Sequence, residues 1–124
     1  MIEDLTLDDA LAAVDELGFV IVDPGLFASA IGRPATTIFS EDAYPDLPTK
    51  AAALFESLGR NHALADGNKR AAWVLMRLLL AINGFGLIAD DDEAEEFVLA
   101  VAQGQLALAA SAKWIAERVQ PLDQ

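Results

Sequence analysis

Ten consecutive residues in the middle of the chain, residues 61–70, carry the groups best suited to chemistry. They read Asn-His-Ala-Leu-Ala-Asp-Gly-Asn-Lys-Arg and include His62, the chain's only histidine. Apolar segments, residues 51–58 and 71–82, flank them on both sides. A polar connector between two buried helices holds reactive groups on a rigid scaffold and leaves them reachable. We therefore take residues 61–70 as the candidate site.

Lys69 and Arg70 occupy positions where a helix usually avoids cations. Asp66 and Gly67 form a turn that leads into a helix at residue 68, so both cations fall in its first turn. The helix dipole disfavours each of them there by about 0.3–1 kcal/mol. Two such exceptions in succession indicate that a negative ligand belongs at this helix start. The free backbone N–H groups of residues 67–69 would then form an anion cradle, with glycine permitting close approach.

His62 and Asp66 add two more functions to the same stretch. An imidazole beside a phosphate-sized site can act as a general base, and a carboxylate can hold Mg²⁺. Composition alone favours a simpler interpretation, in which residues 66–68 are an ordinary turn and helix cap and His62 ends the preceding helix. The two misplaced cations, the glycine and the nearby histidine favour the site.

Length and composition limit the class of protein. A chain of 124 residues with 54% hydrophobic residues predicts one domain, residues 1–124, with a substantial core. Without cysteine there is neither a disulfide framework nor a thiolate metal site. The N-terminus is acidic, and the most apolar stretch is short and interrupted by Arg77. We expect a soluble, cytoplasmic protein without membrane contact.

The charge distribution supports an anion site at the centre of the chain. The net charge of −12 disfavours nucleic acid and anionic membranes as partners. Residues 47–89 nevertheless hold five basic and two acidic residues, a local balance of +3. Three of the bases, Arg60, Lys69 and Arg70, lie close to His62 in sequence. We expect Arg60 to be a solvated helix-end cation and Arg77 to pair with an acid.

Hydrophobic periodicity predicts an all-α bundle of about six helices with a central apolar helix after the candidate loop. Leu7, Leu11, Val14 and Leu17 are expected to form the inward face of the first helix. Residues 19–22 and 85–88 are each a short strand or a connector. In the loop of residues 35–45, the aromatic side chains are expected to fill the core. The expected helices span residues 7–17, 24–32, 47–60, 68–83, about 90–104 and 108–119.

Residues 62–70 resemble the signature of the Fic fold, in particular its death-on-curing (Doc) branch. The Fic pattern is His-Pro-Phe, two or three variable positions, then Gly-Asn-Gly-Arg. Doc-like chains carry lysine in place of the second glycine, as at Lys69. Ala63 and Leu64 depart from the pattern, and we expect Leu64 to anchor the loop as the aromatic residue would. Further similarity lies in residues 5–11, 23–26, 31–34 and 83–84.

The resemblance implies nucleotidyl or phosphoryl transfer from ATP to a protein hydroxyl. It implies that His62 is the general base and that Asp66 holds Mg²⁺. Gly67, Asn68 and Lys69 would form the anion hole, to which Asn68 also contributes its side chain. Arg70 would neutralise the transferred group.

Lys69 favours a protein kinase that moves the γ-phosphate, because lysine fills the space that glycine leaves for two phosphates in adenylylating relatives. The implied target is a threonine of a translation factor such as elongation factor Tu. Adenylyl transfer, and an inactive Fic-fold binding module, remain as alternatives.

The same resemblance implies two protein partners. One is a cognate antitoxin, Phd-like, whose disordered tail would fold onto the protein. Because this chain is acidic, that tail is expected to be basic. The other is the protein target, which residues 33–45 would dock as a flap. The acidic run of residues 90–96 lacks the glycine and the ligand spacing of a calcium loop, so we interpret it as a helix N-terminus.

Overall fold

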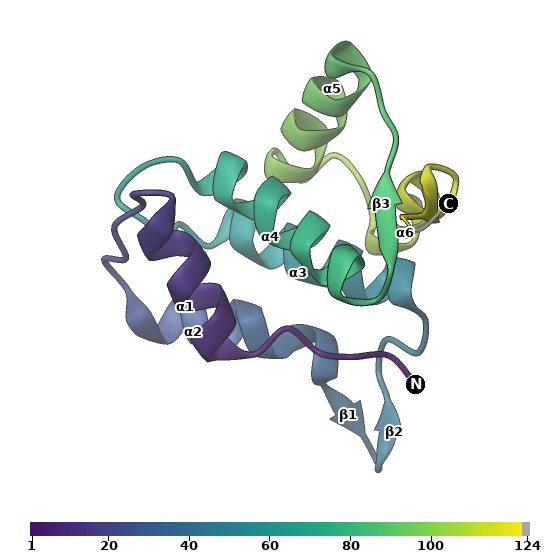
Figure 1. Cartoon of the computed structure of the whole chain (residues 1–124), viewed down its shortest axis with the longest axis horizontal. Coiled ribbons are helices and arrows are strands. Elements are labelled where there is room, and N and C mark those ends of the chain that lie inside the picture. Colours follow the sequence, from purple (N-terminus) through teal and green to yellow (C-terminus); the bar gives the residue numbers. More distant parts are fainter. Residues whose placement is uncertain (123–124) are drawn as a thin grey trace.

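The computed structural model describes residues 1–122 and confirms the predicted all-α class, with six α-helices in that range (Figure 1). Within the same range, no helix is both long and apolar enough to cross a membrane. The helices are α1 (Leu7–Glu16), α2 (Pro24–Gly32), α3 (Leu47–Arg60), α4 (Asn68–Ile82), α5 (Asp91–Ala102) and α6 (Leu108–Ala116). The short elements are η1 (Arg33–Ala35), β1 (Thr37–Ile38), β2 (Glu41–Asp42), β3 (Phe85–Leu87) and β4 (Val119–Pro121).

Side-chain caps fix where four of the described helices begin. The cap of α1 is Thr6, whose hydroxyl oxygen accepts the N–H of the third helical residue at 3.1 Å. Asp23, Asp46 and Asp90 do the same for α2, α3 and α5, at 3.0, 2.9 and 2.8 Å. Each cap stabilises the helix start because it satisfies an otherwise unpaired backbone donor. The predicted starts of these helices are confirmed, including the start at the acidic run before α5.

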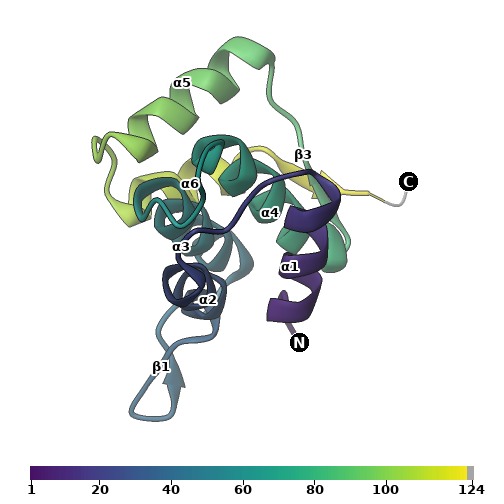
Figure 2. The ribbon, with the colours of Figure 1, turned by 90° about the vertical axis from the view of Figure 1, so that its left-hand side faces the viewer.

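Helices α3 and α4 form the centre of the molecule. Helix α3 is the more enclosed of the two, since α2, α4, α5 and α6 all pack against it. Small residues let the two helices approach closely, and a Cβ at Gly59 would lie 4.0 Å from Cβ of Ala72. Helix α5 stands on one side of this centre and the β1–β2 hairpin projects from the opposite side (Figures 1 and 2).

Two local predictions were wrong for reasons of tertiary packing. On α1 the buried residues are Ala10 and Val14, while Leu7, Leu11 and Leu17 are exposed, because α1 contacts its neighbours along one narrow stripe only.

At the other end of the chain, α6 ends at Ala116 rather than at residue 119. The residues that follow form β4, which pairs antiparallel with β3. Such pairing over more than thirty residues leaves no local signal.

The loop of residues 35–45 is a small β-hairpin, with β1 paired antiparallel to β2. The prediction that its aromatic side chains fill the core was wrong for Phe39, which is 98% exposed at the tip. Phe39 and Ser40 both have positive φ, at 51° and 67°. Tyr44 is half-buried at the foot of the hairpin, where its hydroxyl oxygen accepts a hydrogen bond from Nε of Arg33 at 3.0 Å.

Candidate functional site

The loop between α3 and α4 is fastened to the segment that precedes α2. The carbonyl oxygen of Ala63 accepts hydrogen bonds from Val22 and Asp23, at 2.9 and 3.1 Å, and Ala65 donates to Val20 at 2.9 Å. Leu64 is 4% exposed and forms an isolated β-bridge with Ile21. The prediction that Leu64 anchors the loop is therefore confirmed.

Asn68, the first residue of α4, closes the loop from the inside. Its Oδ1 accepts a hydrogen bond from the backbone N–H of Leu64 at 3.0 Å, and its Nδ2 donates to the Leu64 carbonyl at 3.1 Å. Both polar atoms of the side chain are thus engaged within the loop. The Asn68 side chain was expected to bind an anion, but these two hydrogen bonds occupy it instead. The backbone N–H of Asn68 remains available to an anion.

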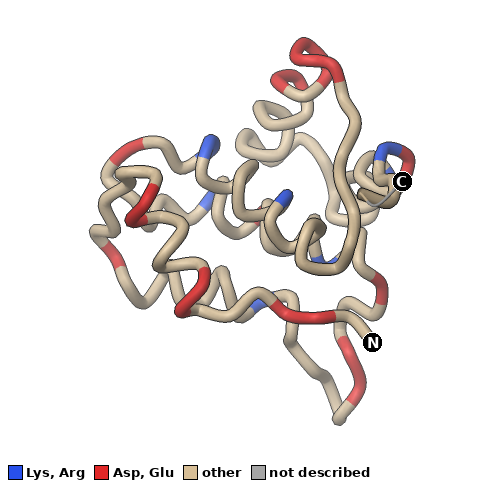
Figure 3. The backbone as a smooth tube through the Cα atoms, viewed as in Figure 1, with Lys and Arg blue, Asp and Glu red and all other residues tan. Residues whose placement is uncertain are grey.

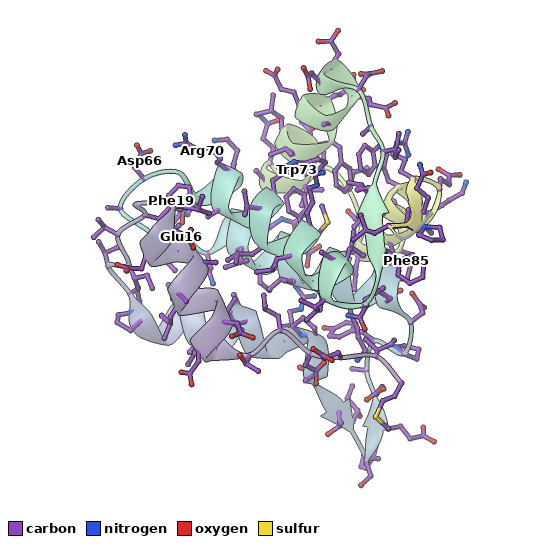
Figure 4. All side chains as sticks on the ribbon, in the orientation of Figure 1. Glu16, Phe19, Asp66, Arg70, Trp73 and Phe85 are labelled. Carbon is purple, nitrogen blue, oxygen red and sulfur yellow. The ribbon has the colours of Figure 1, made fainter. Side chains whose placement is uncertain are left out.

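Gly67 is required by its backbone and by an aromatic neighbour. Its φ is +77°, in the left-handed region that favours glycine. A Cβ at this position would lie 2.4 Å from Cε1 of Phe19, well inside van der Waals contact. The close approach that glycine permits here is therefore the approach of Phe19. Figure 4 shows Phe19 beside Arg70, whose guanidinium carbon lies 5.4 Å from the centre of the ring. Nothing in the residue pattern around Phe19 assigned it to the site.

His62 is exposed and lies in the left-handed region with φ of +55°, an unusual conformation for a residue other than glycine. Its neighbours impose it. Asn61 donates from Nδ2 to the carbonyl of Leu26 at 3.0 Å and accepts the N–H of buried Ala63 at 3.2 Å. Strain of this kind is found at functional positions, where the surrounding structure holds a side chain in a required direction.

Asp66 and the start of α4 form the polar floor of the site. Oδ1 of Asp66 accepts the backbone N–H of Gly67 at 2.8 Å. This N–H is therefore not free, which corrects the predicted three-donor cradle of residues 67–69. The N–H groups of Asn68 and Lys69 still lie in the first turn, where an α-helix supplies no acceptor. The cradle is thus narrower than predicted, and Asp66 stands beside it.

One cavity of about 460 Å³ joins these groups. His62, Asp66, Gly67, Asn68, Lys69 and Arg70 all line it, so the structure brings every predicted site residue together. Further lining comes from the end of α5, through Leu99 and Ala102, and from Gln103, which caps that helix. Sequence reasoning missed these three residues because nothing in their types distinguishes them from a helix surface.

The other three bases of residues 47–89 lie outside this cavity. Arg60 donates from Nε to the carbonyl of Val101 at 2.7 Å, so it joins α3 to the end of α5 and is not a solvated cation. Arg77 lies 5.9 Å from the ring centre of Trp73, and no acid within residues 1–122 pairs with it, contrary to prediction. Lys50 is buried and donates to the Pro34 carbonyl at 2.9 Å. Lys69 and Arg70 are the two cations that line the cavity. Figure 3 shows basic residues in blue where α4 begins.

A larger groove of about 630 Å³ lies between α2 and α3, but its charged groups are paired with one another. Glu56 binds Arg33 at 2.9 Å and Arg60 at 3.2 Å. Burial lowers the pKa of the Arg33 guanidinium, but its hydrogen bonds to Tyr44 and Glu56 outweigh this and raise that pKa above its ordinary value. The ion pairs and the hydrogen bond to Tyr44 make this groove a structural junction between α2, α3 and the foot of the hairpin.

The donor set fits a metal ion only in part. Within residues 1–122, no three His, Cys, Asp or Glu side chains gather as a metal site. Asp66 is the one carboxylate of the cavity. Mg²⁺ commonly binds through one or two carboxylates together with substrate phosphates. The residues present thus suit a Mg²⁺ that arrives with a polyphosphate.

The helices, the loop between α3 and α4 and the cavity at the start of α4 define the class of protein. The profile of the Fic/DOC family matches residues 4–80, and the chain belongs to this family. The matched range includes the whole of the α3–α4 loop. Among characterised relatives, the chain is similar to "Toxin Doc" of Mycolicibacterium smegmatis, with 49% identity over 90 residues. These residues are 73% of this chain and 68% of the relative.

Proposed function

We propose that this protein is a Doc-like toxin that transfers the γ-phosphate of ATP to a hydroxyl group of a translation factor. A threonine of elongation factor Tu is the proposed acceptor. The observation that carries the proposal is the single cavity in which His62, Asp66, the N-terminus of α4 and two cations meet. Phosphoryl transfer needs positioning and electrostatic stabilisation more than covalent chemistry, and this cavity offers both.

In this proposal His62 accepts the proton of the attacking hydroxyl. The hydroxyl oxygen forms a bond to the γ-phosphorus while the bond to the β–γ bridging oxygen breaks, and ADP leaves. The backbone N–H groups of Asn68 and Lys69 bind phosphate oxygens, and Arg70 with Lys69 balances the negative charge. Asp66 would hold the Mg²⁺ that accompanies ATP, and the ion would neutralise charge on the phosphates.

The β1–β2 hairpin is the proposed docking element for the protein target. Phe39 supports this role, since a fully exposed aromatic side chain at a projecting tip gains most of its burial only in a complex. Lys50 holds the base of the hairpin, where its Nζ binds the Pro34 carbonyl at 2.9 Å and lies 3.8 Å from the carboxylate of Asp42.

A cognate antitoxin is the second proposed partner, because the similar mycobacterial protein is named a toxin. With a net charge of −12, this chain would attract a basic, Phd-like disordered tail. The reading frame adjacent to its gene offers a direct check, and an acidic or absent neighbour would argue against this partner.

The test is incubation of the protein and Mg²⁺ with candidate translation factors and ATP labelled at either the α- or the γ-phosphate. Label transferred from the γ position, with a gain of one phosphate in the mass spectrum, is the expected result. Transfer from the α position would replace the proposal by adenylyl transfer. Absence of both would indicate a binding module without activity.

Two variants make this test specific. His62→Ala should abolish transfer and remove growth inhibition, because no other imidazole exists in the chain. Glu96→Ala is the control, since Glu96 is exposed on α5 and outside the lining of the cavity. Equal toxicity of the wild type and His62→Ala would argue against a catalytic role for the site.

A further inference from the structure

Four hydrogen bonds form a ring that fixes both neighbours of His62. The Asn61 side chain accepts the N–H of Ala63 through Oδ1 at 3.2 Å and donates from Nδ2 to the Leu26 carbonyl at 3.0 Å. Leu26 in turn donates its N–H to Oδ1 of Asp23 at 3.0 Å. Asp23 donates its own N–H to the Ala63 carbonyl at 3.1 Å. The start of α2 and the start of the loop between α3 and α4 thus hold each other.

The His62 side chain depends on this ring for its direction. Within residues 1–122, its imidazole makes no hydrogen bond and no ion pair. A histidine that acts as a base is commonly oriented by a hydrogen bond to its second ring nitrogen. Here the backbone takes over this task, because φ and ψ fix where Cβ points and leave only χ1 and χ2 free.

Asn61 acts on the site without facing it. Its side chain lines the groove between α2 and α3, whereas His62 lines the cavity at the start of α4. Asparagine suits this position because its planar amide carries both an acceptor and a donor. A short polar side chain also bonds readily to the backbone two residues further on, as Asn61 does to Ala63. Its role is therefore one of geometry and not of contact with the reacting groups.

We propose that Asn61 is a positioning residue for His62, an inference that rests on the proposed function. The ring holds the His62 backbone at φ of +55°, in the left-handed region, so that the imidazole stays at the cavity without a second group to orient it. Once the ring is opened, the backbone relaxes toward the common regions of φ and ψ. This relaxation turns Cβ, and the imidazole with it, away from the phosphate site.

The loss falls on the rate of transfer and not on nucleotide binding. A misplacement of about 1 Å at a reacting group can lower a rate about 10²-fold. The proposed phosphate ligands are the backbone N–H groups of Asn68 and Lys69 with the Arg70 side chain, and none of these belongs to the ring.

Three variants test this role in the assay with γ-labelled ATP. Asn61→Ala removes both side-chain hydrogen bonds, and we expect kcat to fall about 100-fold while KM for ATP stays unchanged. Asn61→Asp keeps an acceptor for Ala63 and loses the donor to Leu26, so its kcat should fall less. Asn83→Ala is the matched control, because Asn83 also caps the C-terminus of a helix and lies outside the lining of the cavity. Its side chain bonds to the backbone of Glu3 at 2.7 and 2.9 Å, so the control should lose stability and keep kcat.

A second readout does not depend on activity. His62 is the only histidine, so in untagged protein its imidazole Cε1–H group gives a single NMR signal. Relaxation of this signal should show an ordered ring in the wild type and in Asn83→Ala, and a mobile ring in Asn61→Ala. An unchanged kcat in Asn61→Ala, or an imidazole as ordered as in the wild type, would overturn the inference while the proposed function stands. Absence of transfer by the wild type would instead contradict the proposed function, and the relaxation measurement would still decide whether Asn61 orders His62.

Discussion

The contact between Gly67 and Phe19 allows a direct test of how the loop between α3 and α4 is held in place. Gly67→Ala places a methyl group 2.4 Å from Cε1 and 2.9 Å from Cδ1 of Phe19. Gly18 offers a matched control, because its φ of +83° is close to the +77° of Gly67, and a Cβ there would meet nothing within 4 Å. The two substitutions share the backbone strain of a left-handed alanine and differ in the contact with Phe19.

The magnitudes follow from this geometry. The left-handed conformation should cost each alanine variant about 1–2 kcal/mol. At position 67 the Phe19 ring must also withdraw by about 1.2 Å to restore an ordinary carbon–carbon contact. Overpacking of this kind costs about 1–3 kcal/mol, and the half-buried Phe19 can move, so the lower end applies. We therefore expect Gly67→Ala to lower the free energy of unfolding by about 2–3 kcal/mol and Gly18→Ala by about 1–2 kcal/mol.

Urea unfolding of the two alanine variants measures their costs in free energy. The same measurement on Phe19→Ala, with either glycine or alanine at position 67, gives the coupling between the two positions. Removal of the ring should reduce the cost of Gly67→Ala to that of Gly18→Ala, a coupling of about 1 kcal/mol. Equal costs for the two single variants, or no coupling with Phe19→Ala, would refute the claim that Phe19 packs on the motif loop.

Three further predictions concern the loop and its supports. His62→Gly should abolish transfer. In urea unfolding, its free energy of unfolding should equal that of the wild type or exceed it by up to about 1 kcal/mol, because glycine adopts the positive φ without strain. A clear loss of stability would contradict the inferred backbone strain at His62. Asn68→Ala should destabilise by about 1–3 kcal/mol, because it leaves the N–H and carbonyl of Leu64 unpaired, whereas an unchanged unfolding midpoint would argue against that closure. The raised pKa of Arg33 means that its charge stabilises the fold at every pH below the ordinary arginine value and is lost only as pH rises through the higher folded value. The stability difference between wild type and Arg33→Gln should thus stay constant from about pH 6 to 9, and a change above about 1 kcal/mol would disagree.

The sequence was sufficient where the determining interactions are local. Thr6, Asp23 and Asp90 cap helices within three residues of themselves, so the helix starts could be predicted from residue type alone. The candidate loop was equally visible, because a histidine, a carboxylate, a glycine and two misplaced cations lie within nine residues. The family resemblance rests on the same short segment.

The folded structure decided which of these groups are free to act, through contacts within the loop and through one long-range contact. The amide of Gly67 and the side chain of Asn68 were expected to bind an anion, but the first donates to Asp66 and the second closes the loop on Leu64. Arg60 is withdrawn from the site by the carbonyl of Val101, which lies 41 residues further along the chain. Such competition between partners depends on distances in space, which the order of residues does not contain.

The walls around the loop were likewise a product of packing. Phe19, in the segment after α1, and Leu99, on α5, come from separate elements and have ordinary core or surface residue types. The sequence by itself determined the reactive groups and the helices that present them. Only the assembled helices decided the shape of the space in front of those groups, because that space depends on how α4 and α5 pack and on where the segment after α1 crosses the loop.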